Sequence, residues 1–182
     1  MVLAMAGATA TFAAEGIYEV GLIGDAGRST LLTEIADQSK TKVAQAGDTS
    51  SVEVRMGKNV VRFRTAAKPD AKATEGVIRQ ANLLLVVVDA TQGPLPIHRE
   101  QLKLAKDAGA AKAGVVYTNC KMVDDAELME LQIMELRALL KDFGLKGDDA
   151  PIFFDFAQAK TKHIKGIDAM LKKIDEMASA PK

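Results

Sequence analysis

The stretch "LLLVVVDA" at Leu83–Ala90 is a continuous run of apolar and β-branched residues that closes on Asp89 and Ala90. Such a run is typical of a strand that is buried on both faces of a parallel sheet. It therefore predicts an α/β fold in which helices cover both faces of the sheet.

Strand-like and helix-like segments alternate on either side of this run, which predicts a mainly parallel six-stranded sheet with one antiparallel edge hairpin, in a three-layer sandwich. Residues 39–49 are polar and predict a loop, and "GKN" at Gly57–Asn59 predicts the hairpin turn. The predicted strands are Tyr18–Ile23, Ser51–Met56, Val60–Arg64, Leu83–Ala90, Ala113–Thr118 and Ile152–Phe156. The predicted helices are Thr30–Asp37, Ala73–Gln80, Arg99–Ala108, Ala126–Phe143 and Ile167–Met177.

The length of 182 residues suits one α/β domain, which we place at residues 17–180. Residues 1–16 are predicted to form a flexible arm, and "MVLAMAGATATFAA" leaves open an export-signal remnant or a truncation. The 24 basic and 24 acidic residues balance, and aromatic residues make up only 4%. This composition argues against direct nucleic-acid binding.

Cys120 is the only cysteine, so no internal disulfide can form, and we expect a cytoplasmic protein. We interpret Cys120 as a small buried residue rather than a nucleophile, because neither histidine lies in a recognisable triad. No stretch approaches the roughly 20 apolar residues of a membrane span, so no membrane association is expected.

A glycine turn, "GLIGDAGRST" at residues 21–30, follows the first predicted strand. A phosphate-binding loop needs Gly, four residues, Gly, Lys and then Ser or Thr. Here Gly27 is followed by Arg28 and Ser29, and Leu22 stands where the first glycine belongs. The turn is therefore either a shortened phosphate cradle or a plain turn, in which Arg28 is a solvated charge and Ser29 or Thr30 caps the helix.

Residues 86–152, from "VVVDATQGPLPIHREQL" to "GDDAPI", are similar to the second half of the G domain of bacterial elongation factor Tu, a translational GTPase. "EVGLIGDAGRSTLLTEI" resembles the strand, loop and helix that open that domain, and "SSVEVRMGKNVVRFRT" resembles its hairpin. The resemblance covers nearly the whole chain and implies a P-loop G-domain fold. It stops where the G domain stops, so we expect the two β-barrel domains of the family to be lacking.

The resemblance also implies where a nucleotide would lie, and the motifs there depart from the family pattern. The phosphate loop is two residues short, and "RTAAKPDA" lacks the Gly and the His of the family's Asp-x-x-Gly segment. "TNCKMVDD" keeps Asn119 of the guanine motif but has Cys120 and Met122 at the Lys and Asp positions, and only Ala157 matches the last base-contacting element. The candidate nucleotide residues are Gly24, Asp25, Ala26, Gly27, Arg28, Ser29, Thr30, Asn119 and Lys121.

Because four motifs have lost the parts that touch nucleotide, magnesium or water, we expect a degenerate G domain, or pseudo-GTPase, with weak or no GTP binding, no catalytic residue and no cofactor. Asp89 is interpreted as structural. The alternative is a GTP-binding protein with the GTPase activity of the translational elongation factors. GTP or GDP would then be bound with Mg²⁺, which Ser29 would contact. A third possibility is a nucleotide site in which Lys121 changes the base preference.

The helix at residues 126–143 is the candidate binding surface. In elongation factor Tu the similar region docks onto the exchange factor, elongation factor Ts, and onto the ribosomal stalk, so the resemblance implies a translation-associated protein partner. The alternative is a solvated amphipathic helix that was inherited with the fold. Its predicted apolar stripe is Leu128, Leu131, Ile133, Leu136 and Leu139–Leu140.

Overall fold

The computed structural model describes residues 16–68, 70–155, 159 and 162–180. Apart from Gly16, the predicted N-terminal arm lies outside the described residues, as do Phe156 and Ala157. Within them the chain forms the mainly parallel α/β fold that the sequence predicts.

The described strands form one eight-stranded sheet in the order β2-β3-β4-β1-β5-β6-β7-β8. The β2–β3 and β3–β4 pairs are antiparallel, and the remaining neighbours are parallel. The central strand β5 is buried between β1 and β6 along nearly its whole length, as its apolar run predicts. The strands are β1 (Tyr18–Gly24), β2 (Ala44–Ala46), β3 (Thr49–Met56), β4 (Asn59–Ala66), β5 (Leu83–Asp89), β6 (Ala113–Thr118), β7 (Ile152–Phe154) and β8 (Ile164–Lys165).

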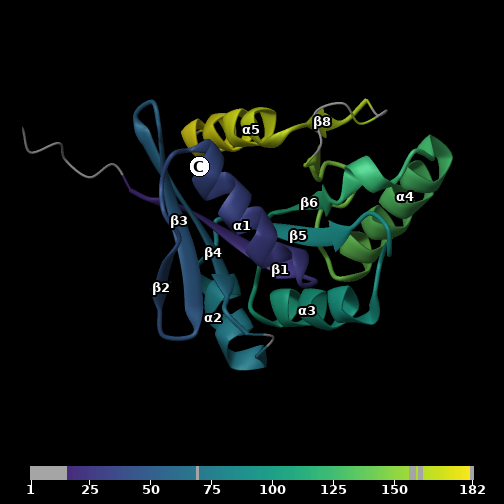
Figure 1. Cartoon of the computed structure of the whole chain (residues 1–182). Coiled ribbons are helices and arrows are strands. Elements are labelled where there is room, and N and C mark those ends of the chain that lie inside the picture. Colours follow the sequence, from purple (N-terminus) through teal and green to yellow (C-terminus); the bar gives the residue numbers. More distant parts are fainter. Residues whose placement is uncertain (1–15, 69, 156–158, 160–161, 181–182) are drawn as a thin grey trace, which may run out of the picture.

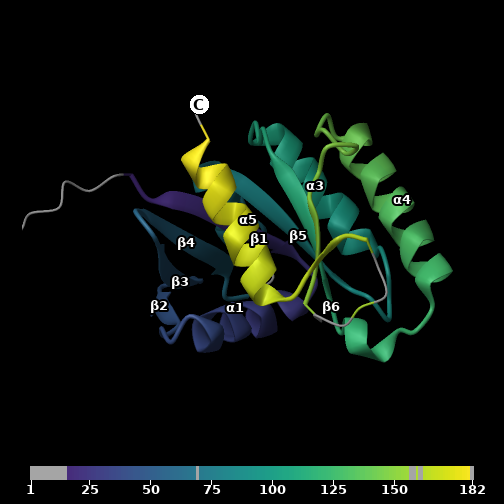
Figure 2. The ribbon, with the colours of Figure 1, turned by 90° about the horizontal axis from the view of Figure 1, so that it is seen from above.

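Helices cover both faces of the sheet, so the molecule has three layers. One apolar cluster joins α1 and α5 to one face, and a second joins α2, α3 and α4 to the other. In Figure 1, α5 lies above the sheet and α2 and α3 lie below it, and Figure 2 shows α3 beside α4. The helices are α1 (Gly27–Gln38), α2 (Ala71–Gln80), α3 (Pro96–Asp107), the short η1 (Cys120–Met122), α4 (Ala126–Asp142) and α5 (Ile167–Ser179).

Two short strands were not predicted. β2 lies inside the segment 39–49 that was expected to be a loop, and β8 pairs with β7 at the opposite edge. Neither carries a run of β-branched residues, so only pairing with a neighbouring strand makes them extended. The predicted count of six strands is therefore corrected to eight in the described part of the chain.

The predicted apolar stripe of α4 is only partly buried. Ile133, Leu136, Leu139 and Leu140 pack in the core, but Leu128 and Leu131 are 44% and 59% exposed. Those two residues lie outside the arc of the helix that faces the sheet, and Gln132 takes a core position in their place. Among the described residues, no helix combines the length and the apolarity that crossing a membrane requires.

Candidate functional site

The turn between β1 and α1 consists of only Asp25 and Ala26, because β1 runs to Gly24 and α1 begins at Gly27. Gly24 has a φ of +116°, and a Cβ at this position would lie 2.1 Å from the carbonyl oxygen of Val87 on β5. The amide of Gly24 donates to Oε1 of Gln101 at 2.5 Å. The turn is therefore packed tightly against β5 and tied to α3.

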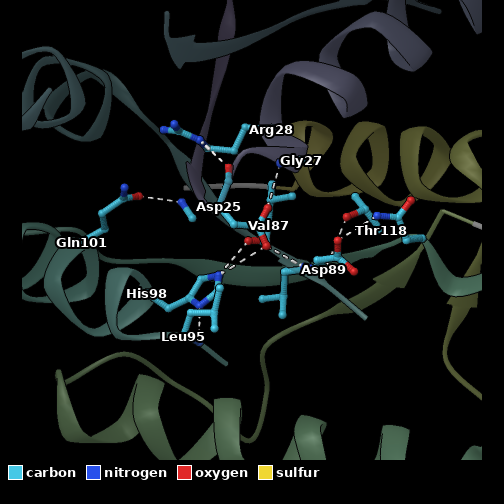
Figure 3. A network of polar contacts seen from close by, with 12 residues as sticks. Asp25, Gly27, Arg28, Val87, Asp89, Leu95, His98, Gln101 and Thr118 are labelled. Carbon is cyan, nitrogen blue, oxygen red and sulfur yellow. Dashed lines mark hydrogen bonds and ion pairs between the residues drawn. The ribbon is translucent and has the colours of Figure 1, made fainter. Parts of the chain in front are cut away.

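The Asp25 carboxylate lies at the start of α1 and accepts two backbone hydrogen bonds. Oδ1 accepts from the amide of Gly27 at 2.8 Å, and Oδ2 accepts from the amide of Asp89 at 2.6 Å. Figure 3 shows this network, with Arg28 and Thr118 on opposite sides of Asp25. The amide of Gly27 lies at the positive end of α1, where an anion is favoured. It already donates to the carboxylate of Asp25, an anionic group of the chain itself.

Arg28 is buried, with 6% of its surface exposed, so the interpretation of this residue as a solvated charge is wrong. Its Nε donates to the backbone carbonyl of Asp25 at 2.8 Å, while Nη1 is buried without a hydrogen bond to a described residue. Burial lowers the pKa of Arg28, and the charge of Asp25 opposes that shift. Because α1 begins at Gly27, three residues earlier than predicted, Arg28 lies in the first turn of the helix, and its side chain is buried.

Ser29 and Thr30 lie within the first turns of α1, and both are exposed. The N-cap residue is Ala26, which forms no side-chain capping hydrogen bond, so neither Ser29 nor Thr30 caps the helix as the plain-turn interpretation allowed. The nearest side-chain acceptor for the start of the helix is Asp25, which bonds Gly27.

Two residues of α3 support the turn, and no pattern in the sequence pointed to either. Gln101 accepts from Gly24, as above, and His98 is fully buried. Nδ1 of His98 accepts from the amide of Leu95 at 2.8 Å, so Nε2 carries the proton and donates to the carbonyl of Val87 at 3.0 Å. Nε2 also lies 3.8 Å from Oδ2 of Asp25. Only the crossing of α3 under β5 brings these side chains to the turn.

Asn119 follows β6 in a left-handed conformation, with a φ of 58°. Its amide and that of Cys120 donate to the carboxylate of Asp155, at 2.8 Å and 3.2 Å. Its Nδ2 donates to Oδ2 of Asp89 at 2.8 Å. Asp155 therefore fixes the loop that would read a base. Cys120 is buried, as the sequence predicts, and its Sγ donates to the carbonyl of Tyr117.

Asp89 links the two halves of the site. Its backbone amide bonds Asp25, and its carboxylate accepts from Asn119 and from Thr91. Burial raises the pKa of Asp89, but the hydrogen bonds from Thr91 and Asn119 outweigh that effect, so the net pKa is lowered. The carboxylate thus joins the loop after β6 to the end of β5, and the interpretation of Asp89 as purely structural stays a prediction.

Lys121 lies in η1 and lines, with Asn119, an open cavity of about 460 Å³ between α1 and α5. Its other lining residues include the acids Glu34, Asp37 and Asp155. Burial raises the pKa of Glu34, Asp155 raises it further, and Lys121 opposes the shift. The space beside the loop that holds Asn119 is therefore lined by more acids than bases.

The fold and the order of these loops agree with one known family. The family model "Elongation factor Tu GTP binding domain" matches residues 71–180, which is more than half of the chain. The chain belongs to this family. The match begins at the first residue of α2, so the glycine turn at Gly24–Thr30 lies before the matched range, while Asn119 and Lys121 lie within it.

In the segment "RTAAKPDA", which lacks the family's Asp-x-x-Gly pattern, Asp70 serves as the N-cap of α2, and its Oδ1 accepts from the amide of Ala73 at 2.8 Å. Asp70 thus has a structural role at a helix end. In the described part of this elongation factor Tu-like domain, no three His, Cys, Asp or Glu residues come together in a group that could hold a metal ion.

Proposed function

We propose that this chain is a pseudo-GTPase: a G domain of the translational elongation factor class that binds GTP weakly or not at all and acts as a protein-binding module through α4. The observation that carries the first part is the position of the Asp25 carboxylate, which accepts from Gly27 at the start of α1 and from Asp89 at the end of β5. A phosphate group would need the same amides and would meet a negative charge there.

The loop length supports this proposal. Backbone amides that wrap around phosphates need a loop of several residues, and here two residues connect β1 to α1. Gly24 cannot move toward β5, because the Val87 carbonyl already fills the space beside its Cα.

The arrangement of charged side chains also supports weak or no GTP binding. Arg28 donates to the Asp25 carbonyl, so the guanidinium that replaces the family's lysine serves the turn itself. On the base side, Asp155 holds the amides of Asn119 and Cys120, and Lys121 faces acids rather than an open acceptor site. The carboxylates of Asp25, Asp89 and Asp155 thus occupy the donors that a guanine nucleotide would use.

Equilibrium binding of labelled GTP and GDP with Mg²⁺ tests this part, with a complete elongation factor Tu as the positive control. We expect no saturable binding to the full chain at nucleotide concentrations that saturate the control. Saturable binding would overturn the proposal in favour of the alternative, a GTP-binding protein with GTPase activity, and binding of another nucleotide alone would favour a changed base preference.

The second part rests on the outer surface of α4. Leu128, Leu131 and Met134 are 44%, 59% and 57% exposed, an unusual density of apolar side chains for one helix surface. The cations of this helix are engaged nearby: Arg137 donates to the carbonyls of Gly147 and Asp148, and Lys141 pairs with Asp148 at 2.7 Å.

The exposed acids Glu127 and Glu135 therefore flank the apolar patch without a basic partner among the described residues. A partner with an apolar centre and a basic rim would complement this surface. We propose a translation-associated protein, an exchange factor such as elongation factor Ts or a ribosomal stalk protein, as that partner.

Binding of purified elongation factor Ts and stalk protein to the full chain tests this part. We expect Leu131→Glu with Met134→Glu to weaken binding by about tenfold or more, because apolar anchors at the centre of an interface dominate its affinity. The matched control is Ile17→Glu with Val43→Glu, which alters two exposed apolar residues, 39% and 41% exposed, away from α4. Absence of binding to both proteins would overturn this part without touching the first.

A further inference from the structure

A cavity of about 330 Å³ lies between α2 and the ends of β3 and β4 that meet at the turn after β2. Figure 1 shows α2 beside these strand ends, on the far side of β4 from α1. The cavity shares none of its lining residues with the glycine turn or with the loop that holds Asn119. It is therefore separate from the site described above.

Charged groups of both signs line this cavity without pairing with one another. Arg64 and Lys72 supply the cations, and Asp48 and Asp70 supply the acids. In the described part of the chain, Lys72 and Asp48 form no ion pair. A cavity with separate positive and negative groups is complementary to a ligand that carries both charges.

The guanidinium of Arg64 is held by side chains of α2 and β1. Its Nη1 donates to Oε1 of Gln80, and its Nη2 lies 3.7 Å from Oε2 of Glu19. Its Nε is buried and has no hydrogen-bond partner among the described residues. The side chain keeps 21% of its surface exposed, so the guanidinium contributes positive charge at the edge of the cavity.

Gly76 is an independent indication that a ligand binds in this cavity. It lies in the interior of α2, where glycine costs about 1 kcal/mol relative to alanine. A Cβ at this position would meet nothing within 4 Å, so no packing contact within the described chain requires glycine. The backbone of Gly76 is a lining element of the cavity, and the missing side chain leaves room for a ligand to lie against the helix.

We propose that this cavity binds an α-amino acid in its zwitterionic form, with the carboxylate beside Arg64 and Lys72 and the ammonium beside Asp48 and Asp70. The Asp70 carboxylate is oriented by its bond to the amide of Ala73, and the turn that carries Asp48 is tied down by the bond from the amide of Ala67 to the Asp48 carbonyl. Both acidic groups therefore stand on fixed backbone.

The test is a titration of the ¹⁵N-labelled full chain with L-alanine, followed by amide chemical shifts. Acetate and methylammonium, each carrying one of the two charges, serve as comparison probes. We expect saturable changes in the amide chemical shifts of Gly76, Lys72 and Thr49 on titration with L-alanine. Either single-charge probe should bind with an apparent affinity that is lower by about tenfold or more.

Two variants locate the binding. Gly76→Leu places a side chain in the cavity and favours the helix, so it should fold and lose the shifts, and Lys72→Met should weaken L-alanine binding by about tenfold. Glu100→Leu, an exposed helix position on α3, is the matched control and should bind as the wild type does. No saturable shift with L-alanine, equal binding of acetate, or unchanged binding in Gly76→Leu would each overturn the proposal.

Discussion

Oδ2 of Asp25 lies 2.6 Å from the backbone nitrogen of Asp89, so the turn after β1 is bonded to the end of β5 by a carboxylate. The other oxygen of the same carboxylate holds the first residue of α1. The carboxylate of Asp25 thus joins the end of β5 to the start of α1.

Asp25→Ala should lower the free energy of unfolding by about 2–3 kcal/mol, because two backbone donors lose a charged acceptor in a partly buried place. Urea denaturation measures the change. Asp37→Ala, at an exposed position on α1, is the control and should stay within about 0.5 kcal/mol of the wild type. Equal losses in the two variants would mean that the bridge contributes nothing.

Gly24→Ala should be far more destabilising than a usual glycine substitution. The φ of +116° disfavours any L side chain, and the new Cβ would overlap the Val87 carbonyl. We expect a loss of at least about 2 kcal/mol, measured by thermal or chemical denaturation.

Gly76→Ala is the matched control for Gly24→Ala, since its Cβ would meet nothing within 4 Å. It should raise the free energy of unfolding by about 0.5–1 kcal/mol through helix propensity. If Gly24→Ala left stability unchanged or raised it, as Gly76→Ala is expected to do, the close approach of Gly24 to β5 would be disproved.

His163 should make stability depend on pH. Burial lowers its pKa below the ordinary value of 6.5, Glu130 opposes the shift, and Arg137 and Lys162 add to it. The unfolded chain therefore binds a proton at pH values where the folded imidazole is still neutral, so stability falls as the pH falls through 6.5 toward the folded pKa. Denaturation of the wild type and of His163→Gln at pH 7.5 and at pH 5.5 measures this; the variant should lose less stability on acidification, and parallel losses would contradict it.

The α4 surface should tolerate charge where the core does not. Leu131→Glu should change the free energy of unfolding by about 0.5 kcal/mol or less, since Leu131 is 59% exposed. Ile133→Glu, two residues away and 2% exposed, should unfold the domain or cost several kcal/mol, because an unpaired carboxylate would enter the core. Comparable effects of the two changes on the denaturation midpoint would show that Leu131 is not an outer residue.

Local patterns were sufficient for much of the fold. The apolar run at Leu83–Ala90 predicted the central strand, and the alternation of segments predicted the parallel sheet and its layers. β2 and β8 were missed because both are short strands without a strand-forming composition, and pairing with neighbouring strands makes them extended. The first helix was placed three residues late, because a glycine followed by a buried arginine does not look like a helix start.

For the candidate site, the sequence alone placed the segments that hold Gly24 and Asn119 at the carboxyl edge of the sheet, because both come at the ends of strands of recognisable pattern. It also determined that the turn is too short for the family's phosphate loop. Only the tertiary structure decided what fills that edge. Asp25 accepts from the end of β5, and Asp89 and Asp155 both accept from the loop after β6, because parallel strands distant in sequence end side by side. Hydrogen bonds between such ends leave no periodic trace along the chain.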